Sequence, residues 1–269
     1  MKKINNFISI TTLATLITLS GCTAITDNPV TAAAKTVKEH IAHKAHWSYT
    51  GHEDPSHWGE LSPKYAECSQ GKNQSPINIT AEDSVHAALK DIAFAYNTNS
   101  NSVINNGHTV QVNIDAGSAI MIDGKTFELK QFHFHSPSEN EINGKHFPLE
   151  AHFVHLDKAG DIAVVAVMFQ EGKSNEALEN VWNKLPLKAS EKVDLALTSA
   201  QVNAILPAQK SYYRFSGSLT TPPCTEGVRW FLLKKPVTIS KEQIEKFVHT
   251  MHHANNRPIQ DINAREVLY

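Results

Sequence analysis

The chain has 269 residues and a formal net charge of −2, from 25 basic and 27 acidic side chains. This length allows one large domain or two small ones, with a substantial buried core. Because neither sign of charge dominates, electrostatics gives no support for a nucleic-acid partner. The less usual number is fifteen histidines, and their placement is more informative than their count.

The N-terminus has the pattern of an export signal. A short basic start, MKK, precedes the apolar run FISITTLATLITLS, which is too short for a comfortable membrane span. The run ends in LSGC at residues 19–22, which resembles the bacterial lipobox, where the cysteine is lipidated and becomes the first mature residue. We predict a lipoprotein-like signal peptide over residues 1–21, lipidation at Cys22 and a lipid-anchored periplasmic protein. An ordinary secretory signal cut nearby is the alternative.

Residues 22–46 are polar and rich in alanine, and they have little to bury. They predict a tether before the folded part of the chain. His40, His43 and His46 follow at intervals of three, so a helix would group them loosely. A metal-gathering role for these three side chains is the alternative to a solvated tether.

Export also bears on the other cysteines. If Cys22 carries lipid, only Cys68 and Cys224 remain. An oxidising compartment allows these two to pair, which would close a loop of about 156 residues. Two free thiols are the alternative, which such a compartment disfavours.

From about residue 47 onward the chain predicts one domain dominated by strands. Apolar or alternating runs occupy residues 102–114, 119–135, 149–157, 161–170 and 228–239. Turn signals separate them, among them Asp-Gly at 123–124 and DKAGD at 157–161. We predict a mainly β fold, with a large sheet and peripheral helices.

Helical periodicity is scarce, and two stretches show it. The first spans residues 174–185 and aligns on one face Ala177, Leu178, Val181, Trp182 and Leu185. The second spans residues 240–253 and begins with Ser240 and Gln243 in capping-box spacing. This second helix is expected to bury Ile244, Phe247, Val248 and Met251.

The segment QFHFHSPSEN, residues 131–140, has the clearest chemical signal. Side chains two residues apart in a strand point to the same face. Gln131, His133 and His135 therefore share one face, and Phe132 and Phe134 share the other. Two imidazoles placed in this way can bind one Zn²⁺ at roughly 2.0–2.1 Å.

A second segment, LEAHFVHL, offers a third ligand in either His152 or His155. His152 shares its face with Glu150 and Val154, whereas His155 belongs to the opposite face. A ligating histidine usually donates its second N–H to an oxygen. Glu150 provides such an oxygen two residues before His152, as Gln131 does in the first segment.

We therefore predict that His133, His135 and His152 hold one zinc ion, with Gln131 and Glu150 behind them. A histidine pair alone often occurs by chance on an exposed strand, but two strands with matching acceptors are harder to obtain by accident. Three neutral imidazoles leave a fourth position for water, which is typical of catalytic rather than structural zinc sites.

Several segments together resemble α-class carbonic anhydrases, namely GKNQSPINI, NNGHTVQV, QFHFHSPSEN, EAHFVH, GSLTTPPCTEGVRW and NNRPIQ. The resemblance covers about Trp47 to the C-terminal region and implies a catalytic domain over residues 47–269. The fold that it implies is a single large, central, mostly antiparallel twisted sheet with peripheral helices. It also implies reversible hydration of CO₂ to bicarbonate and a proton through a zinc-bound hydroxide, with esterase side activity. Because bacterial relatives are often dimers, a homodimer stays open.

The resemblance implies roles for single residues near the zinc. Glu139 and Thr220 match the pair that orients the hydroxide, and Thr221 matches a hydroxyl that contacts substrate or bicarbonate. CO₂ has little polarity, so its pocket is expected to be apolar. The residues that match this pocket are Val154, Val164, Leu219, Val228 and Trp230.

His108 matches the position of the family's proton shuttle, with Asn106 and Gln111 as organisers of water. Asn255 matches the residue whose backbone carbonyl lies behind His135. Without the resemblance, His108 would be interpreted as a surface residue after a glycine turn.

Two positions depart from the family pattern. Glu60 follows HWG where the family commonly has tyrosine, which puts part of the proton-transfer water network in question. Asn140 follows Glu139 where many relatives have histidine, which would alter the support of the glutamate.

Rival functions make different predictions. A non-catalytic binding module with this fold would typically lack a zinc histidine, but all three are present here. A periplasmic zinc-delivery lipoprotein, suggested by the histidines of the tether, predicts exchangeable metal and no CO₂ hydration. A zinc peptidase would need an HExxH helix, and the sequence has none.

Overall fold

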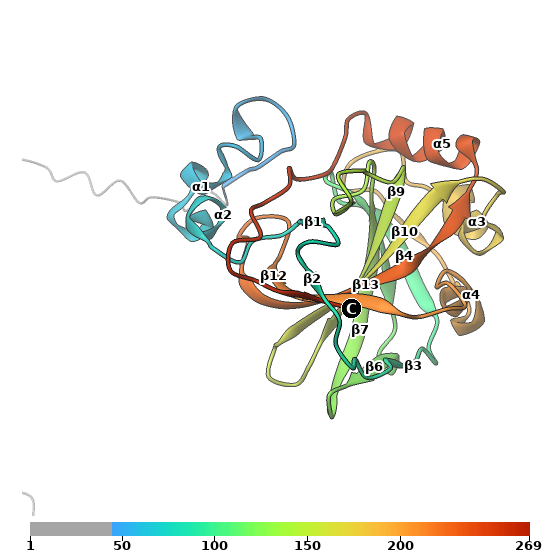
Figure 1. The fold of residues 1–269 in the computed structure, drawn as a ribbon. Coiled ribbons are helices and arrows are strands. Elements are labelled where there is room, and N and C mark those ends of the chain that lie inside the picture. The colour runs from blue at the N-terminus through green and yellow to red at the C-terminus, as the bar shows by residue number, and fades with distance from the viewer. Residues whose placement is uncertain (1–44) are drawn as a thin grey trace, which may run out of the picture. The chain divides into compact units, whose positions relative to one another are not determined.

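The computed structural model describes residues 45–269. The predicted leader, Cys22, His40 and His43 lie outside the described residues, as does the tether except for its last two positions. Most of the described chain is strand and loop (Figure 1). The strands are β1 Asn78–Ile79, β2 Ser84–Val85, β3 Ala93–Ala95, β4 Ser100–Asn105, β5 Val110–Ile114, β6 Ala119–Ile122, β7 Lys125–His135, β8 Glu141–Ile142, β9 Leu149–Leu156, β10 Ile162–Glu171, β11 Lys192–Asp194, β12 Tyr212–Ser218, β13 Glu226–Ile239 and β14 Val267–Leu268.

The helices are short and lie around the sheet (Figure 1). They are α1 Trp58–Leu61, α2 Glu67–Gln70, α3 Glu176–Asn183, α4 Ser199–Ala204 and α5 Lys241–Met251, with 3₁₀ turns η1 Gly51–Glu53 and η2 Pro63–Tyr65. Among residues 45–269, no helix has the length and apolar character needed to span a membrane.

One large twisted sheet forms the centre of the fold. Its strand order is β11-β4-β5-β7-β9-β10-β13-β12-β14-β2, with β6 on β7 and β3 on β6. The β10–β13 and β14–β2 pairs are parallel, and the other pairs of this sheet are antiparallel. A small separate sheet pairs β1 with β8. The predicted mainly β, mostly antiparallel architecture is confirmed.

The central strand β10 is buried on both faces, which explains its nearly continuous apolar sequence. Val165 and Val167 point into the larger core, which also contains residues of α3, α4 and α5. Val164 and Ala166 point into a smaller core on the other face, together with Trp230 of β13. The sheet therefore separates a helix-covered core from a second apolar layer.

A β-bulge interrupts β7 at Lys130. Leu129 pairs with His155 of β9, and the next paired residue of β7 is Gln131, opposite Val154. The extra residue reverses which side chains face the larger core. Phe127 and Leu129 face it before the bulge, whereas Phe132 and Phe134 do so after it.

In several places, short sequence motifs adopt the local structure that they predict. Asp123 and Gly124 have φ values of 52° and 76° in the β6–β7 turn, as a two-residue type I′ hairpin requires. Ser240 and Gln243 form a reciprocal capping box at the start of α5. One expectation was wrong, because Val248 of α5 is 43% exposed rather than buried. Val248 lies on the solvent side of the helix, whereas the preceding residue, Phe247, points into the core.

Candidate metal centre

Three imidazoles converge on one face of the sheet. His133 and His135 come from β7, and His152 comes from β9 directly opposite His133. One nitrogen from each ring lies within 4.8 Å of the other two, a spacing that suits ligation of a single metal ion. The structure thus brings together the three histidines that the sequence predicts.

An oxygen lies behind each ring and fixes its orientation. Nδ1 of His133 is 2.8 Å from Oε1 of Gln131, and Nδ1 of His135 is 2.7 Å from the carbonyl oxygen of Asn255. Nε2 of His152 is 2.9 Å from a carboxylate oxygen of Glu150, close enough for an ion pair but without the alignment of a hydrogen bond. This leaves Nε2 of His133, Nε2 of His135 and Nδ1 of His152 facing one another.

These nitrogen atoms have the chemical state that a metal requires. Burial lowers the pKa of His133 and His152 well below the ordinary value, and the neighbouring imidazoles lower it further. Burial also lowers the pKa of His135. Nε2 of His135 is buried without a hydrogen-bond partner, as expected of an atom whose partner is a cation. The residues present therefore fit a three-nitrogen metal site.

His155 lies in the larger core, on the opposite face of β9 from His152. Its Nε2 is 2.8 Å from the hydroxyl of Tyr96, and its Nδ1 is 3.2 Å from the carbonyl oxygen of Ala163. Its ring stacks on that of Tyr96. Both polar atoms of this histidine therefore have partners in the core, away from the converging ring nitrogens.

Glu139 is fully buried beside the imidazoles. Its Oε2 lies 3.5 Å from Nε2 of His135 and 3.8 Å from Nδ1 of His152. Its Oε1 accepts a hydrogen bond from the backbone N–H of Arg257 at 3.0 Å. Burial raises the pKa of Glu139 to about 8, against the lowering effect of the hydrogen bond from Thr220. The predicted Glu–Thr pair is thus in contact next to the histidines.

Asn140 supports a different carboxylate from the one expected. Its side-chain amide donates to Oε1 of Glu150 at 2.8 Å, and its backbone N–H donates to Oε2 at 2.9 Å. The backbone N–H of Glu139 also donates to Oε2 of Glu150, at 2.7 Å. Asn140 therefore helps to fix the carboxylate behind His152, and the side chain of Glu139 is held by other groups.

A cavity of about 140 Å³ lies in front of the imidazoles. Its lining residues are Trp47, Tyr49, Asn106, His108, Thr109, Gln111, Gln131, His133, His135 and Thr221. The predicted shuttle histidine, its two polar neighbours and the substrate-contacting threonine therefore share one space with two of the ligand candidates.

Sequence reasoning missed Tyr49. Glu60 is exposed, and a tyrosine reaches the cavity from the N-terminal segment instead. The hydroxyl of Tyr49 is buried without a hydrogen-bond partner. Burial raises its pKa, and the charge of Glu139 adds to this effect. The signal that could have revealed it is the segment WSY at residues 47–49, which has the Trp-x-Tyr spacing and precedes the HWG segment at residues 57–59.

Asn106 and Asn255 shape the turn that presents His108. Oδ1 of Asn106 accepts hydrogen bonds from the backbone N–H groups of His108 and Thr109, both at 2.9 Å. The side-chain amide of Asn255 donates to the carbonyl oxygen of His108 at 3.1 Å. Because the carbonyl of Asn255 also holds His135, one residue connects the turn of His108 to the candidate metal site.

The predicted apolar pocket residues lie together beside His152. Val164 of β10 pairs with Val154 of β9 and with Trp230 of β13, which forms a row across three strands. The Trp230 ring centroid is 4.9 Å from that of His152. Val228 and Leu219 belong to the same apolar cluster.

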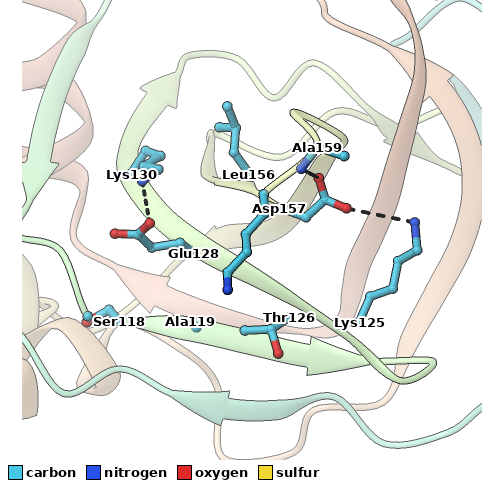
Figure 2. A pocket seen from close by; sticks show the side chains of 11 residues that line it. Ser118, Ala119, Lys125, Thr126, Glu128, Lys130, Leu156, Asp157 and Ala159 are labelled. Carbon is cyan, nitrogen blue, oxygen red and sulfur yellow. Dashed lines mark hydrogen bonds and ion pairs between the residues drawn. The ribbon is translucent and has the colours of Figure 1, made fainter.

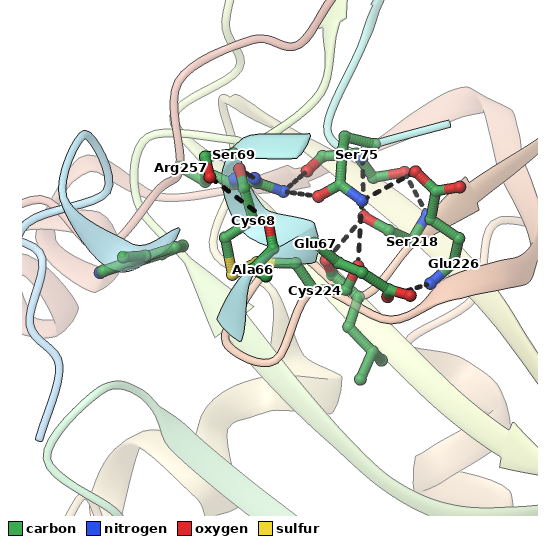
Figure 3. The surroundings of a disulfide bond; sticks show 12 residues. Ala66, Glu67, Cys68, Ser69, Ser75, Ser218, Cys224, Glu226 and Arg257 are labelled. Carbon is green, nitrogen blue, oxygen red and sulfur yellow. Dashed lines mark hydrogen bonds between the residues drawn. A yellow bond between two sulfur atoms is a disulfide. The ribbon is translucent and has the colours of Figure 1, made fainter. Parts of the chain in front are cut away.

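Cys68 of α2 and Cys224 of the β12–β13 loop form a disulfide, with Cα atoms 5.0 Å apart (Figure 3). This confirms the predicted pairing. Buried Arg257 donates to the carbonyl oxygen of Cys68 at 2.7 Å, and Gln74 donates to that of Cys224 at 3.0 Å. The backbone N–H of Cys224 donates to the carbonyl oxygen of Thr221 at 2.8 Å, so the bridge is joined to the threonine turn.

A larger cavity, of about 520 Å³, lies along β6, β7 and the β9–β10 turn (Figure 2). None of the three converging histidines lines it. Two of its lining lysines have carboxylate partners, since Lys125 lies 3.8 Å from Asp157 and Lys130 lies beside Glu128. Size alone therefore does not mark the functional site, whereas the smaller cavity has the convergent imidazoles and carboxyl group.

The mainly β fold and three neutral imidazoles beside a buried carboxyl group define a class of metal-dependent enzymes. Known proteins specify the class further. The profile described as eukaryotic-type carbonic anhydrase matches residues 53–269. A carbonic anhydrase of Pectobacterium carotovorum is 50% identical over 224 residues, which are 83% of this chain and 91% of that protein. One from Neisseria gonorrhoeae is 49% identical over 224 residues, with 83% and 87% coverage.

Solved structures agree. The α-carbonic anhydrase of Thermovibrio ammonificans, in complex with the inhibitor sulfanilamide, matches with a TM-score of 0.82 at 51% sequence identity. The match covers 84% of this chain and 100% of that chain. The chain belongs to the α-class, or eukaryotic-type, carbonic anhydrase family of enzymes.

Proposed function

We propose that this protein catalyses the reversible hydration of CO₂ to bicarbonate and a proton, with Zn²⁺ held by His133, His135 and His152. The observation that supports this most directly is the convergence of three uncharged ring nitrogens, each oriented by an oxygen behind it. An all-nitrogen set of three suits Zn²⁺ in a catalytic site. When bound, Zn²⁺ supplies Lewis acidity that lowers the pKa of water to about 7.

Glu139 and Thr220 orient the attacking oxygen. The Thr220 hydroxyl donates a hydrogen bond to the ionised Glu139 carboxylate, which leaves its oxygen to accept a hydrogen bond from the attacking oxygen and to direct a lone pair of that oxygen toward carbon. The raised pKa of Glu139 reflects burial without a cation. A positive charge near the carboxylate favours the ionised form, which is the form this role requires.

The apolar cluster beside His152 provides a surface for CO₂, which has no charge and few hydrogen-bonding needs. Val154, Val164 and Trp230 lie on the same face of the sheet as the imidazoles. Leu219 and Val228 complete this cluster, and Thr221 provides a hydroxyl in the cavity for bicarbonate.

Each turnover releases a proton that must leave the cavity. His108 lines the cavity and is half-buried, so its imidazole accepts a proton on the inner side and releases it outward. The same centre is proposed to hydrolyse activated esters as a side activity.

Stopped-flow CO₂ hydration combined with metal analysis of the purified protein tests the proposal. His133→Ala, His135→Ala and His152→Ala should each lose bound zinc and lower kcat/KM by at least about a hundredfold, because two nitrogens hold zinc poorly. The matched control is His57→Ala, an exposed histidine paired with Asp54 outside the cavity. Full activity in any of the three site variants would refute this metal site.

A further inference from the structure

An aromatic pair adjoins the cavity. The His108 ring stacks on Trp47, with centroids 3.7 Å apart and planes 12° apart. His46, the residue before Trp47, places its ring centroid 6.3 Å from that of His108. The His46 side chain is 71% exposed, whereas His108 is half-buried and lines the cavity. The two imidazoles thus lie in succession from the cavity to bulk water.

The His46 ring is held in a defined position. Its Nδ1 is 3.1 Å from Oε2 of Glu53, which makes Nδ1 the protonated nitrogen of the neutral ring. Within residues 45–269, no residue bonds its Nε2. The neighbouring Trp47 is itself packed edge-on against Trp58, with centroids 5.1 Å apart. Nε2 of His46 is therefore the atom that can accept a proton.

We propose that His46 is a second proton-transfer residue, which receives the proton from His108 and releases it to bases in solution. This inference rests on the proposed CO₂ hydration. The ring separation is too long for a direct hydrogen bond but suits one bridging water.

The proton count balances at each transfer. An N–H of protonated His108 gives its proton to the bridging water, and the water gives one of its protons to Nε2 of His46. The imidazolium of His46 keeps its Nδ1–H bond to Glu53 and loses the Nε2 proton to a buffer base. Both rings then return to their neutral forms.

His46→Gln tests the proposal, because glutamine keeps polarity and similar size but does not titrate. In weak buffer, kcat should fall about threefold, because kcat includes the export of the proton. The ratio kcat/KM should stay unchanged, because it does not include that step. Added imidazole should restore kcat. The control is His52→Gln, an exposed histidine in the adjacent turn η1, which should match the wild type.

A double variant tests whether the two histidines act in series. In a His108→Ala background, which itself should lower kcat in weak buffer about tenfold, His46→Gln should have no further effect. An unchanged kcat in His46→Gln, or an equal loss in both backgrounds, would overturn the inference and leave CO₂ hydration intact. A wild-type protein without CO₂ hydration would instead overturn both proposals.

The metal-free protein provides a readout that does not depend on activity. If the rings are adjacent in solution, ring hydrogens of His46 and His108 should show a nuclear Overhauser effect, and Glu53→Gln should weaken it. A wild-type spectrum without this effect would contradict the geometry on which the relay depends.

Discussion

At the scale of single residues, the alternation of side chains along a strand places His152 and His155 on opposite faces of the sheet. His152 and His155 lie on the same strand, yet only His152 faces the other imidazoles. Because alternate residues of a strand point to opposite faces, the sequence alone was enough to choose between them. Tyr49 could not be found in this way, because its place in the cavity depends on where a non-helical N-terminal segment lies.

The first residue-level prediction concerns the buried partner of Tyr96. His155→Phe should keep zinc at the wild-type level but lower the free energy of unfolding at pH 7 by about 1–3 kcal/mol, because the Tyr96 hydroxyl loses its buried partner. Metal analysis and urea unfolding measure the two quantities. Loss of zinc from a folded His155→Phe protein would show that His155 is a ligand.

The same residue predicts a pH dependence. Burial lowers the pKa of His155 to about 3, whereas an unfolded histidine has a pKa of about 6.5. Between these values the unfolded chain binds a proton that the folded protein does not. The stability contributed by neutral His155 is therefore complete above about pH 6.5 and is lost as the pH falls, by at most about 1.4 kcal/mol per pH unit.

Urea unfolding of the wild type and His155→Phe from pH 7 to pH 4 measures this effect. The stability difference between them should shrink as the pH falls and reverse in sign by about pH 4, since the variant lacks this proton-binding group. A difference that stays constant over the range would show that His155 is not buried in its neutral form. The three converging histidines are common to both proteins, so their contributions cancel in the comparison.

Elements whose signals are local were predictable from the sequence. The Asp123–Gly124 turn and the Ser240–Gln243 capping box each depend on residues a few positions apart. The bulge at Lys130 was not predictable, because it is defined by the pairing of β7 with β9. The strand β12 was also missed, since its sequence YYRFSGS alternates weakly and depends on β13 for its place.

The disulfide links two elements far apart in sequence, with a separation of 156 residues. Cys68→Ser combined with Cys224→Ser should lower the free energy of unfolding by about 4–5 kcal/mol, because the unfolded chain regains the freedom that a long closed loop removes. Calorimetry with and without reductant measures this effect. The double variant should no longer respond to reductant, and a wild type with an unchanged melting temperature on full reduction would contradict the prediction.

The disulfide is also connected to the turn that contains Thr221, because the backbone N–H of Cys224 donates a hydrogen bond to the carbonyl oxygen of Thr221. The double serine variant should therefore lose part of its kcat at temperatures where it is still folded. Its zinc content should not change, because the ligands come from β7 and β9.

At the scale of the whole molecule, the order of strands in the sheet could not be predicted from the spacing of apolar residues. β10 pairs in parallel with β13 across more than one intervening helix, and nothing local specifies that partner. The apolar runs predicted a large sheet with peripheral helices, and the resemblance in several separate motifs provided its mostly antiparallel arrangement. Export and lipid anchoring concern residues outside those described, so they stay predictions.

The export prediction can be tested on the full chain. In a bacterial host, the wild type should fractionate with membranes and incorporate labelled fatty acid, because a lipidated cysteine provides the anchor. Cys22→Ser should abolish the label and release the protein from the membrane fraction. A wild type that is processed but unlabelled and soluble in the periplasm would support an ordinary secretory signal instead.

The extra residue at Lys130 has a consequence for how this chain tolerates changes in length. Removal of Lys130 would restore regular alternation along β7, with Leu129 and the phenylalanines still in the larger core and both imidazoles still on the cavity face. Gains or losses in the preceding hairpin leave the downstream orientation untouched. Family members should therefore tolerate loss of the bulge, whereas removal of the residue between His133 and His135 should turn one of these two imidazoles away from the cavity.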